Sequence, residues 1–206
     1  MTSLDPTASV MPEDRSAAGY GPVRKVLRRW PSLVAAALAA FVLADGGTDF
    51  PAILTGAALV YLGAAVLGRR GMAWPLFLGT VVMIGLGKFA VTAFDLPIEI
   101  TLLMVALGVA GAVYGLARTA AGRAMIVGPS AVAMLGFGAV AAAAVLATPV
   151  PAGIVVGLGL LGHAAWDCAH FRRNTVVARS LAEFCGVLDT LLGIAVIVLV
   201  AVGTLS

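Results

Sequence analysis

Residues 150–170 read VPAGIVVGLGLLGHAAWDCAH, a run that is apolar for more than half its length and ends with two histidines and an aspartate. An α-helix rises about 1.5 Å per residue, so about 20 residues cross the hydrocarbon core of a bilayer. The run therefore predicts a transmembrane helix with ionisable side chains near its C-terminal end. Ionisable groups in such positions are costly and usually have a function.

The composition indicates that the whole chain is a membrane protein. Hydrophobic residues make up 61% of the 206 residues, charged residues make up 11%, and the mean hydropathy is +1.07. Soluble domains have about 45–50% apolar and about 25% charged residues, so an ordinary soluble domain is excluded. The apolar runs are continuous, whereas the strands of a β-barrel alternate apolar and polar residues. We therefore expect an all-α, polytopic bundle of transmembrane helices in a lipid bilayer.

Turn residues and charges divide the chain into a tail and seven apolar segments. Residues 1–21 are polar and contain prolines and acidic residues, which predicts a disordered cytoplasmic tail. The remainder, 22–206, is expected to form a single transmembrane helical domain. Its predicted helices are 31–44, 51–68, 72–94, 98–117, 124–147, 150–170 and 181–204. The first of these is short for a span and would have to tilt or thin the bilayer.

The basic residues orient this bundle, because all except Lys88 lie before the first predicted helix or in alternate connections between the predicted helices. Basic loops stay in the cytoplasm, so we expect the N-terminus inside and, after seven spans, the C-terminus outside. The dominance of Arg over Lys and the abundance of Ala, Gly and Val are typical of high-GC bacterial genomes, which predicts a bacterial cytoplasmic membrane. Basic residues in short loops beside membrane spans form no nucleic-acid footprint, so no nucleic-acid partner is expected.

Lys88 is the basic residue that departs from this pattern. It lies in the predicted helix 72–94, near its outer end. A lysine in this position extends to the outer surface or pairs with an acidic residue, for which the nearby candidates are Asp45, Asp49 and Asp95. The functional alternative is an anion or proton site in the outer half of the bundle.

Small residues predict where the helices pack closely. Gly153 and Gly157 are four residues apart in the predicted helix 150–170, and Gly111 and Gly115 repeat this spacing in 98–117. Such pairs let two helix backbones approach each other. We interpret them as packing within the chain and not as a dimer contact.

The last two predicted helices bring polar side chains to one depth in the membrane. A short connection makes them an antiparallel pair, in which His163 lies opposite Asp189 and Asp167 lies opposite Cys185. His163, Asp167 and His170 share one helix face, because they are four and three residues apart. We therefore expect these five residues to form one polar cluster that faces the cytoplasm.

Several interpretations of this cluster remain open. The leading functional one is a metal site, in which His163, Asp167, His170 and Cys185 supply ligands for a divalent metal such as zinc. Its hydrolytic version uses a metal-bound water, with a carboxylate as the catalytic base, from either Asp189 or Glu183. The alternatives are proton-linked transport of a small solute, or a non-catalytic role in which His–Asp pairs only lock two helices together.

Two groups of residues beside the cluster have two interpretations each. Ser180 and Glu183 match a capping box, which would start the last helix at Ser180 and make the glutamate structural instead of catalytic. Trp166 either lines the site or anchors its helix at the interface. Three arginines of the connection would hold a lipid headgroup or a phosphate-bearing small molecule, unless they only set the topology: Arg172, Arg173 and Arg179.

Overall fold

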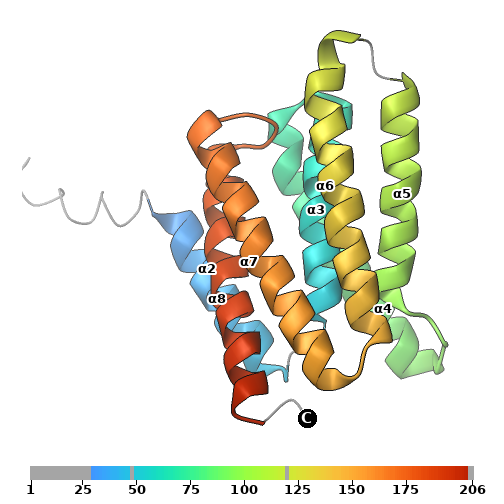
Figure 1. The fold of residues 1–206 in the computed structure, drawn as a ribbon, viewed down its shortest axis with the longest axis vertical. Helices are drawn as coiled ribbons and strands as arrows, with labels where there is room; N and C mark the ends of the chain where they lie inside the picture. Colours follow the sequence, from blue (N-terminus) through green and yellow to red (C-terminus); the bar gives the residue numbers. More distant parts are fainter. Residues whose placement is uncertain (1–28, 47–48, 119–120, 204–206) are drawn as a thin grey trace, which may run out of the picture. The chain divides into compact units, whose positions relative to one another are not determined.

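The described part of the chain from residue 31 onward folds as a bundle of helices (Figure 1). The computed structural model describes residues 29–46, 49–118 and 121–203, and the predicted tail at 1–21 lies outside these ranges. Within them there are seven α-helices, one for each predicted segment, so the all-α prediction is confirmed there. They are α2 (Trp30–Ala44), α3 (Phe50–Leu67), α4 (Ala73–Phe94), α5 (Ile100–Arg118), α6 (Ala121–Leu146), α7 (Pro149–Arg173) and α8 (Arg179–Ala201), with a short 3₁₀ turn at Arg70–Met72.

Six of these helices, α3 to α8, are long and apolar enough to cross a membrane by length and composition. The first helix, α2, has only 15 residues, as its sequence predicted. The outer surface of the bundle is apolar as well. One side of α4 exposes Leu78, Val82, Leu86 and Phe89 by 58%, 57%, 63% and 60%. A contiguous apolar surface of this kind needs a non-aqueous partner, so these features are those of a multi-pass membrane protein.

Local sequence explains where several helices begin and end. α3 ends at Gly68, which has a left-handed φ of 65°, a conformation that glycine adopts without strain. α4 ends at Asp95, also left-handed with a φ of 51°, and Pro97 follows two residues later. α7 carries Pro149 in its first turn, where the missing N–H has no partner to lose.

The helix pair α7–α8 and the central helix α3 enclose the part of the core that matters for the site. α7 and α8 form the most extensive helix pair and lie side by side in Figure 1. α3 contacts α4, α5, α6, α7 and α8 and is the most buried of the six long helices. Side chains from all three helices meet in one buried apolar cluster, which includes Tyr61, Leu160 and Leu188.

Glycines bring α7 and α8 into backbone contact. A Cβ atom added to Gly193 would lie 2.9 Å from the carbonyl oxygen of Gly157, and one added to Gly157 would lie 3.2 Å from that of Gly193. On α5, a Cβ atom at Gly115 would lie 2.6 Å from the side chain of Val66 on α3. The predicted role of these small residues in packing within the chain is therefore confirmed.

The capping box predicted at the start of α8 is wrong. The helix begins one residue before Ser180, and its N-cap residue, Ala178, makes no side-chain capping bond. Ser180 Oγ instead accepts a hydrogen bond of 3.0 Å from Trp74 Nε1 on α4. Glu183 Oε1 accepts one of 2.6 Å from Ser32 Oγ on α2. Partners on other helices occupy the atoms that a local capping box would use, and sequence spacing does not reveal such partners.

Candidate functional site

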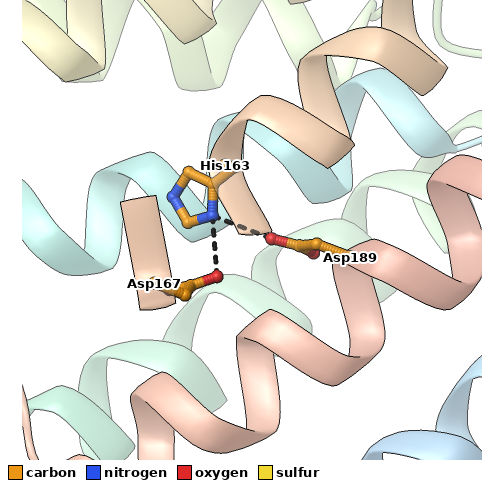
Figure 2. Close-up of side chains that lie close together, drawn as sticks. All are labelled: His163, Asp167 and Asp189. Atoms are coloured by element: carbon orange, nitrogen blue, oxygen red, sulfur yellow. Dashed lines mark hydrogen bonds and ion pairs between the residues drawn. The ribbon is translucent and has the colours of Figure 1, made fainter. Parts of the chain in front are cut away.

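A buried cluster of three ionisable side chains joins α7 to α8 (Figure 2). His163 Nδ1 lies 2.8 Å from Asp189 Oδ2 on α8 and 3.2 Å from Asp167 Oδ2, one turn further along α7. The shorter distance is that of a hydrogen bond, in which the imidazole N–H donates to the Asp189 carboxylate. The contact between His163 and Asp189 that the antiparallel pairing predicted is therefore confirmed.

The cluster is shielded from solvent and contains unpaired polar atoms. The relative exposure is 0% for His163, 0% for Asp167 and 1% for Asp189. In the part of the chain that the structure describes, Nε2 of His163, Oδ2 of Asp167 and Oδ1 of Asp189 have no hydrogen-bond partner. An unpaired buried polar atom costs about 1–3 kcal/mol, so each one calls for an explanation such as a bound ion.

Tyr61 of α3 is a fourth member of the cluster, which sequence reasoning missed. Its Oη donates a hydrogen bond of 2.5 Å to Asp167 Oδ1, and the side chain is 1% exposed. A hydrogen-bonded and ion-paired chain thus runs from Tyr61 through Asp167 and His163 to Asp189. The sequence feature that could have pointed to Tyr61 is its position as the single tyrosine inside the apolar segment 50–67. A buried tyrosine hydroxyl usually has a partner, but spacing within one helix cannot identify a partner on another.

Aromatic rings surround the cluster, and His170 belongs to them. The His163 ring meets the Phe137 ring of α6 edge-on at a centroid distance of 4.9 Å. His170 Nδ1 donates a hydrogen bond of 2.9 Å to the carbonyl oxygen of Trp166, and its ring lies 4.6 Å from the Trp166 ring and 4.9 Å from the Tyr61 ring. His170 and Trp166 therefore extend an aromatic wall beyond the cluster, next to Tyr61.

Only part of the predicted ligand set comes together. Among the described residues, the ligand atoms that lie within 4.8 Å of one another belong to His163, Asp167 and Asp189. Cys185 is a buried free thiol on α8, one turn before Asp189, and lies outside this group. The Cβ atom of Asp167 packs instead against the neighbouring Gly186, where an added Cβ would lie 3.3 Å away.

The predicted arginines lie at the end of the α7–α8 pair where the short connection joins the two helices. Arg172 and Arg173 are exposed at the C-terminal end of α7. Arg179 Nε donates a hydrogen bond of 3.2 Å to the carbonyl oxygen of Phe171, and its guanidinium lies 5.8 Å from the centre of the Phe171 ring. Arg179 thereby satisfies a carbonyl group in the last turn of α7, which is a structural role.

Lys88 lies in a separate ionic group. Its Nζ atom is 2.7 Å from Asp49 Oδ2 and 3.1 Å from Asp45 Oδ2. These contacts join α4 to the connection between α2 and α3, and they confirm the predicted pairing of Lys88 with nearby acidic residues.

Comparisons of the chain with protein-family models, with curated protein sequences and with solved structures found no match. The function must therefore be argued from the site. One imidazole and two carboxylates in a buried cluster beside aromatic rings can hold a divalent cation, share protons, or lock helices together.

Proposed function

We propose that this protein is a multi-pass membrane protein whose centre of His163, Asp167 and Asp189 binds a divalent metal ion, with zinc as the first candidate. The observation that carries the proposal is the convergence of three ligand-type side chains within 4.8 Å, each with one buried atom that has no hydrogen-bond partner among the described residues. A cation bound there would engage Asp167 Oδ2, which has no hydrogen-bond partner among the described residues, and would take the place of the proton between His163 Nδ1 and Asp189 Oδ2.

Charge balance supports a divalent ion. Two ionised carboxylates and a neutral imidazole carry a charge of −2 in an apolar interior, where an unbalanced charge is strongly unfavourable. A bound divalent cation makes this set neutral. Tyr61, through its hydrogen bond to Asp167 Oδ1, leaves Oδ2 of that carboxylate available to the ion.

The distances between the candidate ligand atoms fit a tetrahedral zinc site after a small adjustment. Zinc binds imidazole nitrogen and carboxylate oxygen at about 2.0–2.2 Å, which separates neighbouring ligand atoms by about 3.3 Å in a tetrahedral site. His163 Nδ1 and Asp167 Oδ2 are already 3.2 Å apart, whereas the 2.8 Å between His163 and Asp189 would have to widen. Three protein ligands are also the number found in catalytic zinc sites, where the fourth position holds a water that the metal activates for hydrolysis.

Metal content tests this proposal directly. The protein, purified in detergent and equilibrated with zinc, should contain one zinc ion per chain by elemental analysis. Asp189→Asn should weaken zinc binding by more than the about 10–100-fold typical of outer-shell changes, because it removes a ligand. Cys168→Ala, which removes an exposed thiol next to Asp167 on α7, is the control and should retain the zinc. Zinc-free protein, or equal zinc in both variants, would exclude a metal centre here.

A second candidate is a proton relay in a proton-linked transporter. The hydrogen-bond distance of 2.8 Å between His163 and Asp189 favours it, because a proton and not a metal ion fits between atoms so close. In this case, protein in liposomes should carry a pH-gradient-dependent flux that His163→Gln abolishes. Metal-free protein without such a flux would leave the cluster as a structural lock between α7 and α8.

We further infer that the N-terminus lies in the cytoplasm of a bacterial cell and the C-terminus outside. The support is the placement of the basic residues in alternate connections, together with six helices of spanning length. The short helix α2 decides the outcome, since the C-terminus is outside only if α2 also crosses. Alkaline phosphatase fused after Ser206 should be active, whereas the same fusion after Arg118 should be inactive. Inactive phosphatase and a fluorescent C-terminal reporter would contradict the seven-span arrangement.

A further inference from the structure

A second feature of the molecule is a cavity of about 220 Å³ that lies between α2, α3, α4 and α8 and ends at the cluster. Its walls are mostly apolar and include Leu38, Phe41, Ile53, Phe77, Leu188 and Leu192. Phe41, on α2, is 67% exposed, and Val81, on α4, is 45% exposed, so the cavity borders the outer surface of the bundle between these helices.

The polar groups of this cavity are mainly acceptors. Three carboxylates line it, from Asp45, Asp49 and Asp189, against a single ammonium group, that of Lys88. The ammonium group is already shared between Asp45 and Asp49. Thr80 also lines the cavity, but its hydroxyl donates to the carbonyl oxygen of Phe77.

Asp189 connects the cavity to the buried cluster. It is the member of the His163–Asp167–Asp189 cluster that lines the cavity, and it is 1% exposed. Its Oδ2 atom is engaged by His163, whereas its Oδ1 atom has no hydrogen-bond partner among the described residues. A buried carboxylate oxygen without a partner, at the end of an otherwise apolar cavity, requires a hydrogen-bond donor from outside the protein.

We propose that this cavity binds a small lipophilic amine, with its ammonium group on Asp189 Oδ1 and its apolar body between α2, α3, α4 and α8. Between the carboxylates at its two ends the cavity has apolar walls, which suit the body of an organic cation better than the water shell of a hydrated metal ion. The excess of carboxylates disfavours an anion. The volume is below the about 300–1,000 Å³ of pockets for drug-sized molecules, which limits the ligand to roughly the size of one aromatic ring with a short side chain.

A second cavity adjoins this site. It has a volume of about 640 Å³, and it is lined by Glu99 and Pro149 near the same end of the bundle as the Lys88 ion pairs. Asp49 and Lys88 line both cavities, so their 2.7 Å ion pair lies where the two adjoin.

This inference goes beyond the metal centre and does not depend on it, because Oδ1 of Asp189 is the atom that His163 leaves free. The test uses benzylamine as the cationic probe, with benzyl alcohol and benzoate as neutral and anionic probes of similar size. Binding to the purified full-length protein in detergent is measured by calorimetry, and zinc content is measured on the same samples.

Two variants and a matched control test whether the amine binds in this cavity. Gly85 lines the cavity, and a Cβ atom added there would meet nothing within 4 Å, so Gly85→Leu should fold and fill the space. Gly79 lies on the same helix, also has open space around an added Cβ, and does not line the cavity, so Gly79→Leu is the control. Asp189→Asn keeps the shape of the side chain and removes its charge.

Benzylamine should bind at least about tenfold more tightly than benzyl alcohol, because hydrogen bonds to charged groups are the stronger ones. Gly85→Leu and Asp189→Asn should each weaken benzylamine binding by about tenfold or more, and Gly79→Leu should not. Equal binding of all three probes, or unchanged benzylamine binding in Gly85→Leu, would overturn the proposal. If zinc is present and benzylamine does not bind, the amine site fails while the metal centre stands.

Discussion

His163→Ala should lower the free energy of unfolding by about 3–5 kcal/mol, the cost of removing one partner from a buried ion pair. The imidazole lies between two carboxylates, 2.8 Å from Asp189 and 3.2 Å from Asp167, and all three side chains are at most 1% exposed. Without it, two carboxylates face each other in an apolar interior. Asp189→Asn should cost less, because a neutral amide needs no counter-charge.

The double variant, His163→Ala with Asp189→Asn, should be less destabilised than the sum of the two single variants. Coupled neighbours of this kind show interaction energies of about 0.5–3 kcal/mol. Only part of the loss should be recovered, because Asp167 keeps its charge and its bond from Tyr61. The free energy of unfolding of all three variants is measured on metal-free protein in detergent. Cys168→Ala, at an exposed position on α7, is the control. Strict additivity would mean that His163 and Asp189 do not interact.

Gly193→Val should destabilise the protein by about 3 kcal/mol, the upper end of the usual cost of overpacking. The first carbon of the new side chain would lie 2.9 Å from the backbone oxygen of Gly157 and 3.0 Å from the Leu161 side chain. A backbone atom cannot rotate away, so α7 and α8 would have to separate. This separation would also lengthen the contact between His163 and Asp189, and the variant should lose bound zinc together with stability.

Two glycines on α6 provide the control for this prediction. At Gly128 and Gly136 an added Cβ atom would meet nothing within 4 Å. Gly136→Ala should therefore be neutral or stabilising, by up to about 1 kcal/mol from helix propensity, whereas Gly128→Ala should gain less because its Cβ would crowd the ring of Pro129. Thermal unfolding in detergent compares the three variants, and a Gly193→Val protein as stable as these would contradict the close contact of the two helices.

The sequence by itself determined the helices and one helix contact. A continuous apolar run of membrane-spanning length is expected to form an α-helix, because a helix pairs the backbone N–H and C=O groups within the same segment, where lipid offers no partners. The contact between His163 and Asp189 was also predictable. A short connection makes α7 and α8 antiparallel, so residues equally far from the connection in sequence lie opposite each other. Lys88 was predictable for a similar reason, since acidic residues bracket it at the same end of the bundle.

Only the tertiary structure decided which side chains complete the site and which do not. Tyr61 reaches Asp167 from α3, and Ser32 reaches Glu183 from α2, across 106 and 151 residues of sequence. His170 shares a helix face with His163, yet it pairs with the backbone of Trp166 and packs on aromatic rings. Periodicity specifies which face of a helix a residue lies on, but the rotation and depth of the neighbouring helix specify what that face meets. Those depend on the packing of many side chains at once, which no spacing within a single helix encodes.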